Sequence, residues 1–237
     1  MQMKDTQPGT LIQLPVGKVS IQKKFISKRN RVFLCSIRGK INAEHAILKQ
    51  YLTGNPEKEY EILKMLYEHG LNVPQPYFFN QIYLIMDYIP GVLLCDLVET
   101  ADMSWTEKIV EWFIAFHSTM EQEGTSYVKK DVNLRNFVFF NDEFYGIDFE
   151  ETSVGQPACD IGGLAAHILT NKPRFTQTKQ KAVDMIIKSY CKAKGDVTPS
   201  DMAKCLWQEL LKIAARRPNE RQEILKYCFM NQKGWTS

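Results

Sequence analysis

The sequence predicts an α+β protein in which a β-rich part precedes a mainly helical part. Up to about residue 87, short runs of β-branched, aromatic and aliphatic residues alternate with turn residues, as strands and hairpins do. From Leu93 onward, apolar residues recur mainly at helical spacing. Strands that come before helices along the chain, instead of alternating with them, are typical of an α+β fold.

Composition indicates an ordinary folded protein with one or two domains. The chain has 237 residues, of which 44% are hydrophobic and 24% charged, enough for a sizeable core. The net charge of +3 is too small to indicate nucleic-acid binding. No apolar run reaches the ~18 residues of a membrane span, so neither nucleic acid nor a membrane is an expected partner. Composition does not indicate an oligomeric state.

The six cysteines are scattered and form no C-x-x-C pair. This pattern disfavours both a zinc site and a disulfide framework, and it fits a reducing environment. The first residues show no signal-peptide pattern. We therefore expect a cytoplasmic protein.

In the β-rich part, strands are predicted at residues 19–26 and 31–37, around a turn that contains Ser27 and Lys28. A third strand at residues 43–52 carries Lys49. Its neighbours Ile47 and Leu48 make an apolar setting that is unusual for a solvated lysine. The alternative is that Lys49 belongs to an edge strand and points into water.

A helix is predicted from Pro56 to Gly70, because proline suits the first turn and glycine the C-terminal cap. Its buried stripe consists of apolar residues at helical spacing: Ile62, Leu63, Leu66 and Tyr67. Glu59 lies one turn before this stripe and points inward, so it is the candidate partner of Lys49. Alternatively, Glu59 only favours the positive end of the helix dipole.

Two further strands are expected at residues 77–79 and 82–87, after which Pro90 and Gly91 break the pattern as a turn. A long helix follows whose apolar stripe is Trp105, Ile109, Trp112, Phe113, Phe116 and Met120. This stripe indicates core. His117 flanks it and is expected to be structural.

The candidate metal ligands and the candidate base lie between residues 128 and 150. Asp131 and Asn136 precede a predicted hairpin of residues 137–140 and 144–147, and Asp148 follows it, so both loops should meet at one end. Carboxylate and amide oxygens suit Mg²⁺, and phosphoryl transfer needs metal ligands together with a carboxylate that orients the attacking hydroxyl. Alternatively, Asp131 caps a turn and Asp148 merely ends a strand.

The order Asp131-x₄-Asn136, hairpin, Asp148-Phe149-Glu150 resembles the protein-kinase-like superfamily. It is most similar to the aminoglycoside phosphotransferase and choline kinase branch. This resemblance implies a two-lobe fold, with a β-rich lobe at residues 1–86, a hinge at 87–91 and a helical lobe at 92–237. The catalytic loop would be residues 129–136 and the metal loop residues 148–150.

The resemblance also implies ATP and Mg²⁺ as cofactors. Asp131 would be the catalytic base, assisted by Asn136, and the metal ligands would be Asn136 and Asp148. Seven residues would bind the nucleotide: Lys49, Glu59, Ser27, Lys28, Asp87, Tyr88 and Ile89. Lys49 would bind the phosphates, with Glu59 as its ion-pair partner. Ser27 and Lys28 would cover the phosphates, and the last three residues would contact adenine.

The chain departs from the superfamily pattern at two places. The turn at residues 27–30 contains no glycine, so Ser27 and Lys28 either meet phosphate or form a solvated hairpin tip. Lys129 stands where the superfamily usually has histidine, which puts the local geometry in question. Arg135, within the catalytic loop, either favours the transferred phosphate or lies at the surface.

Asp160 matches a second aspartate of the branch, which braces the catalytic loop through backbone amides. The alternative is a plain helix N-cap. Only eleven residues separate Asp148 from Asp160, and they contain no Ala-Pro-Glu, so a small molecule is a better acceptor than a protein.

We therefore predict an ATP-dependent phosphotransferase that moves the γ-phosphate to a hydroxyl group of a small molecule. One alternative is a catalytically inactive kinase-like protein that binds nucleotide or a partner, suggested by the departures at residues 27–30 and Lys129. The other is an atypical protein kinase. The sequence does not indicate the acceptor, nor ATP over GTP.

Overall fold

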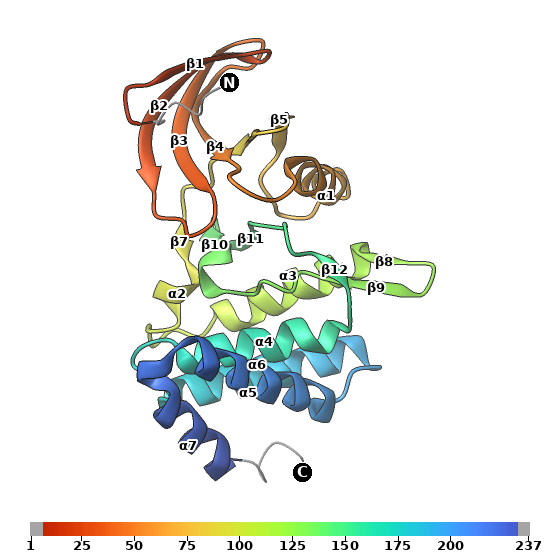
Figure 1. Ribbon diagram of the computed structural model, residues 1–237. Coiled ribbons are helices and arrows are strands. Elements are labelled where there is room, and N and C mark those ends of the chain that lie inside the picture. Colours follow the sequence, from red (N-terminus) through yellow and green to blue (C-terminus); the bar gives the residue numbers. More distant parts are fainter. Residues whose placement is uncertain (1–6, 232–237) are drawn as a thin grey trace. The chain divides into compact units, whose positions relative to one another are not determined.

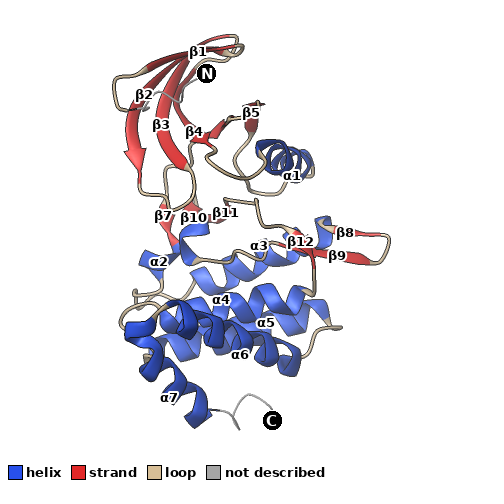
Figure 2. Cartoon of the chain, in the orientation of Figure 1, coloured by secondary structure: helices blue, strands red, loops and turns tan. Residues whose placement is uncertain are grey.

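The computed structural model describes residues 7–231, and these form two compact units (Figure 1). The first, here called the β-rich unit, ends at Pro90, and the second, the helical unit, begins at Gly91. Figure 2 shows strands dominating the first unit and helices the second.

The β-rich unit contains one antiparallel six-stranded sheet in the order β1-β2-β3-β4-β6-β5. Its strands are β1 Leu11–Leu14, β2 Gly17–Phe25, β3 Arg31–Gly39, β4 Ala43–Gln50, β5 Pro76–Phe79 and β6 Tyr83–Asp87. The predicted strands are present, whereas β1 was not predicted. Alternate residues of β2 and β3, such as Val19, Ile21, Phe33 and Cys35, are buried in the core of this unit.

Helix α1, Pro56–Glu68, is the one helix in the described part of this unit. The Asn55 side chain caps it by accepting from the Glu57 amide at 3.0 Å, and Pro56 occupies its first turn. Its buried residues are Pro56, Glu59, Leu63 and Leu66. Helix α1 packs on β5 and β6, which turns the Glu59 side chain inward.

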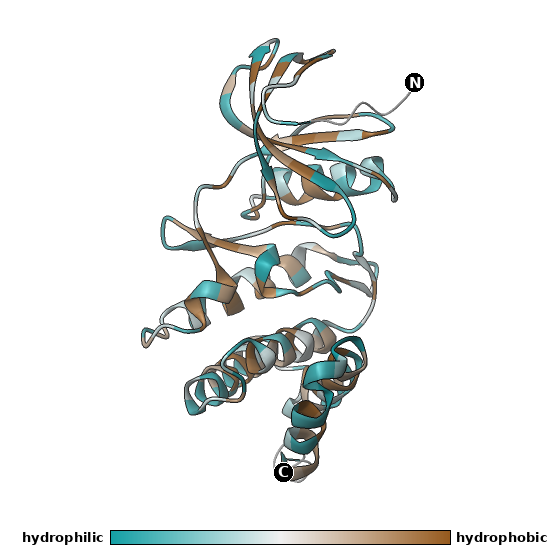
Figure 3. Cartoon of the chain, turned by 60° about the vertical axis from the view of Figure 1, so that its left-hand side comes forward, coloured by the Kyte–Doolittle hydropathy of each residue, from teal (hydrophilic) through white to brown (hydrophobic). Residues whose placement is uncertain are grey.

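The helical unit contains six α-helices among the described residues. They are α2 Leu94–Leu97, α3 Trp105–Thr119, α4 Pro157–Thr170, α5 Gln177–Lys194, α6 Pro199–Arg216 and α7 Arg221–Asn231. Figure 3 shows hydrophobic and hydrophilic residues alternating along the long helices. Two short sheets complete the unit, β11-β10-β7 and β12-β9-β8.

The short strands are β7 Val92–Leu93, β8 Glu121–Gln122, β9 Thr125–Val128, β10 Phe137–Phe140, β11 Glu143–Gly146 and β12 Ser153–Val154. The 3₁₀ turns are η1 Leu134–Asn136 and η2 Pro218–Glu220. The predicted hairpin is present as β10 and β11, joined at Asn141 and Asp142, which have φ values of 51° and 62°. Two residues with positive φ are typical of a tight hairpin turn.

Helix α4 packs closely against two partners through adjacent glycines. A Cβ atom on Gly162 would lie 2.6 Å from the backbone of α6, at the Met202 oxygen and the Leu206 nitrogen. A Cβ atom on Gly163 would lie 2.9 Å from a methyl group of Val132, in the loop before η1. Helix α4 therefore links α6 to the segment that contains Asp131.

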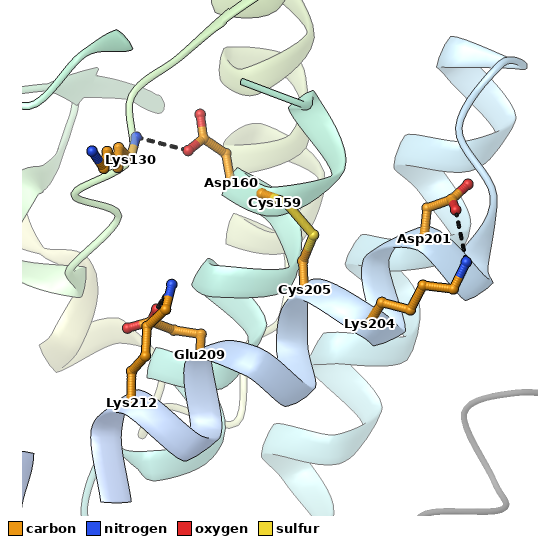
Figure 4. Close-up of a disulfide and its surroundings, with 8 residues drawn as sticks. All are labelled: Lys130, Cys159, Asp160, Asp201, Lys204, Cys205, Glu209 and Lys212. Atoms are coloured by element: carbon orange, nitrogen blue, oxygen red, sulfur yellow. Dashed lines mark hydrogen bonds and ion pairs between the residues drawn. A yellow bond between two sulfur atoms is a disulfide. The ribbon is translucent and has the colours of Figure 1, made fainter. Parts of the chain in front are cut away.

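The expectation that disulfides are disfavoured is wrong at one place. Cys159 of α4 and Cys205 of α6 form a disulfide across 46 residues of sequence, with a Cα–Cα distance of 4.9 Å (Figure 4). The close approach of the two helices at Gly162 brings these cysteines together. No sequence spacing reveals such a pair, because the contact depends on how α4 and α6 pack. Four described cysteines remain as free thiols: Cys35, Cys95, Cys191 and Cys228.

Candidate active site

In the β-rich unit, the expected ion pair between Lys49 and Glu59 is present. The Lys49 Nζ atom lies 2.7 Å from Glu59 Oε2, and the side chains are 7% and 0% exposed. Strand β4 points Lys49 inward instead of toward water, and α1 supplies the carboxylate. A buried lysine with one carboxylate partner keeps its ammonium in a defined place, which suits the binding of phosphate.

Tyr51 belongs to the same cluster and was missed as a candidate in the sequence. Its hydroxyl donates to Glu59 Oε2, the oxygen that also pairs with Lys49, and the Lys49 ammonium lies 5.1 Å from its ring centre. The available signal was the two-residue spacing from Lys49, which places both side chains on one face of an extended segment. Tyr51 is 4% exposed, and its hydrogen bond helps to hold the Glu59 carboxylate in place.

The turn between β2 and β3 is exposed and basic. Ser27 and Lys28 both lie there, beside a pocket of about 300 Å³ in the surface of the β-rich unit. Asn30 is buried and accepts from the Leu52 amide at 3.2 Å, which ties the base of the turn to the end of β4. The turn thus has a fixed base and exposed polar side chains.

The segment predicted to meet adenine lies at the end of β6. The Asp87 carboxylate accepts from the Tyr77 hydroxyl and from the Gln75 amide at 3.3 Å. Burial, together with the hydrogen bond to Asp87, raises the pKa of Tyr77. The Tyr88 ring is stacked with Phe25, with 6.3 Å between ring centres. The Asp87 side chain is therefore engaged within the unit, and Tyr88 and Ile89 are half-buried beyond it.

In the helical unit, the loop from Asp131 to Asn136 is held by its own hydrogen bonds. Asp131 Oδ1 accepts from the Asn133 amide at 3.3 Å, and Asn136 Nδ2 donates to the Asp131 carbonyl at 3.2 Å. Because the amide nitrogen of Asn136 is used here, its Oδ1 atom remains the cation-binding end of the side chain. Arg135 is exposed.

The loop after β11 lies beside the loop from Asp131 to Asn136, as expected from the predicted hairpin. Phe137 pairs with Gly146 at the end of the ladder, and the Ile147 amide donates to the Asn136 carbonyl at 2.9 Å. Asp148 follows directly, with a φ value of 62°, in the left-handed region that non-glycine residues seldom occupy. The two loops therefore emerge side by side at one end of the hairpin.

Glu150 is a second carboxylate in the metal loop that was not predicted as a ligand. One of its oxygens lies within 4.8 Å of an oxygen of Asp148. The signal for it was present in the Asp148-Phe149-Glu150 order. The carboxylates of Asp148 and Glu150 are hard oxygen donors, as the amide oxygen of Asn136 is, and such donors fit Mg²⁺ or Ca²⁺ and not a softer metal.

Asp160 braces the predicted catalytic loop through backbone amides, as the resemblance implied, and is not an N-cap. Its carboxylate accepts from the Lys129 amide at 2.7 Å. It also accepts from the Lys130 amide at 2.8 Å (Figure 4). Helix α4 begins earlier, at Pro157, so Asp160 is its fourth residue. His117 is structural, as expected, because its ring bonds Asp160 at 3.0 Å and the Tyr190 hydroxyl at 2.8 Å.

His167 lies on α4, two turns beyond Asp160. Burial lowers its pKa to about 4, against the opposing charges of Glu209 and Asp131. Its Nε2 atom lies 3.8 Å from Glu209 Oε1, which also contacts Arg216. The ring is therefore neutral near pH 7, in the neighbourhood of the candidate base.

The comparisons with known proteins agree with the fold and the candidate residues described above. Residues 26–155 match the sequence profile of the RIO domain, a range that contains Lys49, Glu59, Asp131, Asn136 and Asp148. No curated protein matches the chain at the level of sequence. None of the described helices is long and apolar enough to cross a membrane.

Several solved structures share the fold. A Plasmodium vivax ethanolamine kinase matches with a TM-score of 0.64 and 10% identity, over 92% of this chain and 82% of its own. An amicoumacin kinase in complex with AMP-PNP, Ca²⁺ and its ligand matches with a TM-score of 0.67 and 11% identity, over 85% and 87%. The streptomycin–ATP–APH(2″)-IIa complex matches with a TM-score of 0.61 and 14% identity, over 81% and 83%. These likenesses confirm the protein-kinase-like fold.

Proposed function

The chain belongs to the RIO domain family, and from this membership we propose that it is an ATP-dependent phosphotransferase acting on a hydroxyl group. The observation that carries the proposal is the junction of two loops in the helical unit. The hydrogen bond from Ile147 to Asn136 holds Asp131, Asn136 and Asp148 at one end of a hairpin. A base beside two oxygen ligands is the arrangement that phosphoryl transfer requires.

Asp131 is the proposed base. Its carboxylate would orient the acceptor hydroxyl and take its proton while the oxygen forms a bond to the γ-phosphorus and the bond to the β-phosphate oxygen breaks. Asn136 and Asp148, with Glu150 as a further candidate, would hold Mg²⁺, which neutralises charge on the phosphates. ADP and the phosphorylated acceptor are then the products.

In the β-rich unit, Lys49 is proposed to bind the α- and β-phosphates, with Glu59 and Tyr51 fixing its position. Ser27 and Lys28 are proposed to meet phosphate through side chains and backbone amides, in place of a glycine-rich loop. Asp87, Tyr88 and Ile89 are proposed to meet adenine. Because the Asp87 carboxylate is already engaged, that residue would contribute through its backbone.

The acceptor is proposed to be a small molecule. Ethanolamine, amicoumacin and aminoglycoside kinases share the fold, and only eleven residues separate Asp148 from Asp160. Membership in the RIO domain family favours an atypical protein kinase as the second candidate. Transfer from ATP to a protein, including the chain itself, would distinguish the two.

The decisive measurement is transfer of labelled γ-phosphate to a panel of aminoglycosides, amino alcohols, sugars and nucleosides. We expect Asp131→Ala to lose roughly 10²- to 10⁴-fold in turnover, because a positioned base contributes about that much. Binding of ATP should persist. Asp184→Ala, at an exposed position of α5, is the matched control and should keep full activity. Equal turnover in both variants would refute the assignment.

A further inference from the structure

Lys129 is a buried cation in the centre of the candidate site. It is 0% exposed, although lysine is seldom fully buried. It stands where the superfamily usually has histidine, so its sequence position alone suggested a weakened site. Its contacts show instead that the ammonium group binds the backbone of the metal loop.

The Lys129 ammonium donates two hydrogen bonds to backbone carbonyls of the metal loop. Nζ lies 2.7 Å from the Ile147 oxygen and 2.6 Å from the Asp148 oxygen. It also lies 4.7 Å from the ring centre of Phe149 and 5.7 Å from that of Phe137, which are favourable cation–π distances. The ammonium thus contacts the metal loop on both sides of the proposed ligand.

The hydrogen bonds from Lys129 hold the backbone of Asp148, which has an unfavourable conformation. Asp148 has a φ value of 62°, and a non-glycine residue in this region is held there only when its surroundings fix it. The carbonyl of Asp148 is one of the two groups that Lys129 binds. The other end of Lys129 is anchored as well, because its amide donates to Asp160 at 2.7 Å.

We propose that Lys129 is a positioning residue which fixes the backbone of Asp148 and so sets the affinity of the metal loop for a divalent cation. This inference rests on the proposed function, since it concerns the same metal site. It also explains the departure from histidine. An ammonium has three donors and can bind both carbonyls, whereas a neutral imidazole has a single N–H donor.

Whether cation binding becomes stronger or weaker without Lys129 distinguishes a positioning role from a purely electrostatic one. Removal of a buried positive charge near a cation site would by itself strengthen cation binding. Loss of the two hydrogen bonds would release the Asp148 backbone and weaken cation binding. Lys129→Met, which keeps much of the side-chain length without charge or donors, therefore gives opposite results under the two explanations.

The probe is Mn²⁺, titrated by electron paramagnetic resonance into protein saturated with AMP-PNP, well below the melting temperature of each variant. We expect Lys129→Met to bind Mn²⁺ roughly ten- to a hundred-fold more weakly than wild type, the usual effect of losing a residue that orients a metal ligand. Lys129→Gln, which retains a donor, should recover part of the loss.

Lys179 provides a matched control within the same unit. It is 1% exposed, and its ammonium also binds backbone carbonyls, those of Asn171 at 2.7 Å and Pro173, together with Glu99. Lys179→Met should lower the melting temperature but leave Mn²⁺ affinity at the wild-type value. A loss of Mn²⁺ affinity in both lysine variants would show a general effect of destabilisation and overturn the inference.

The remaining outcomes are also distinct. Unchanged or tighter Mn²⁺ binding by folded Lys129→Met would overturn the positioning role and leave the proposed function intact. If Lys129→Met does not fold, the same titration on Lys129→Gln decides, with unchanged affinity counting against the role. Wild-type protein that binds neither AMP-PNP nor Mn²⁺ would overturn the proposed function and this inference together.

Discussion

At the scale of single residues, the candidate site depends on buried charged groups whose partners fix their direction. Lys49 is held by Glu59, and Lys129 is held by the carbonyls of Ile147 and Asp148. Buried charges are costly unless they are paired or hydrogen-bonded, so these contacts are needed for folding as well as for the proposed chemistry.

His167 makes stability depend on pH. Its pKa is 6.5 in an unfolded chain and about 4 in the folded protein. Between these values the unfolded state binds more protons, so stability is full above pH 6.5 and falls as the pH is lowered toward 4. We expect His167 to account for about 3 kcal/mol of this loss.

Urea unfolding at a series of pH values from 7 to 4 measures this contribution. In His167→Gln the fall in the free energy of unfolding should be smaller than in wild type by about that amount, on the order of 3 kcal/mol. The same loss in both proteins would show that the charged form of His167 is tolerated in the folded state.

At the scale of elements, helix α4 determines how the predicted catalytic loop is supported. Its face toward the loop carries Asp160 and Gly163, and the adjoining face carries Gly162 and Cys159 toward α6. Glycines permit both close approaches, because a side chain at either position would meet its neighbour. The loop is thereby attached to the most extensively packed pair of helices in its unit.

Two alanine substitutions test this packing. In Gly162→Ala the new Cβ would lie 2.6 Å from backbone atoms of α6, which cannot move without separating the helices. We expect a loss of about 1–3 kcal/mol in the free energy of unfolding, since overpacking exceeds the gain in helix propensity. Thermal or urea unfolding provides the measurement.

Gly163→Ala is the matched comparison, because its Cβ would meet only a methyl group of Val132 at 2.9 Å. That side chain can adjust, so the free energy of unfolding should stay within about 1 kcal/mol of wild type. If Gly162→Ala proved as stable as Gly163→Ala, the close contact between α4 and α6 would not hold.

At the scale of the whole molecule, the candidate functional residues are divided between the two units. Lys49, Glu59, Ser27 and Lys28 belong to the β-rich unit, whereas Asp131, Asn136 and Asp148 belong to the helical unit. A nucleotide that binds these residues only in the folded state is required to stabilise that state.

Thermal unfolding with Mg²⁺ and AMP-PNP tests this requirement. We expect a higher melting temperature than with AMP-PNP and a chelator, and the increase should grow with the logarithm of ligand concentration over its dissociation constant. Lys49→Met should abolish the increase, because phosphate binding is lost, whereas Asp131→Asn should retain it. An increase that survives Lys49→Met would assign the nucleotide to other residues.

Local patterns in the chain were sufficient for much of the fold and for the main candidates. The apolar neighbours of Lys49 spoke against a position in water, helical spacing turned Glu59 toward it, and hairpin geometry brought Asn136 next to Ile147. These features depend on neighbours within about a dozen residues, so spacing alone predicts them. The strands β7, β8 and β12 were not predicted, because two residues are too few to show an alternation, and the four-residue β9 was also missed.

The contacts that support the candidate site could be found only in the tertiary structure. Lys129 binds carbonyls 18 and 19 residues away, Asp160 accepts from amides 31 and 30 residues away, and Cys159 meets Cys205 across 46 residues. No periodicity encodes such pairs, because they depend on how separate elements pack against one another. Residue spacing together with the family resemblance therefore identified the groups proposed to act, and packing decided which buried partners hold them in place.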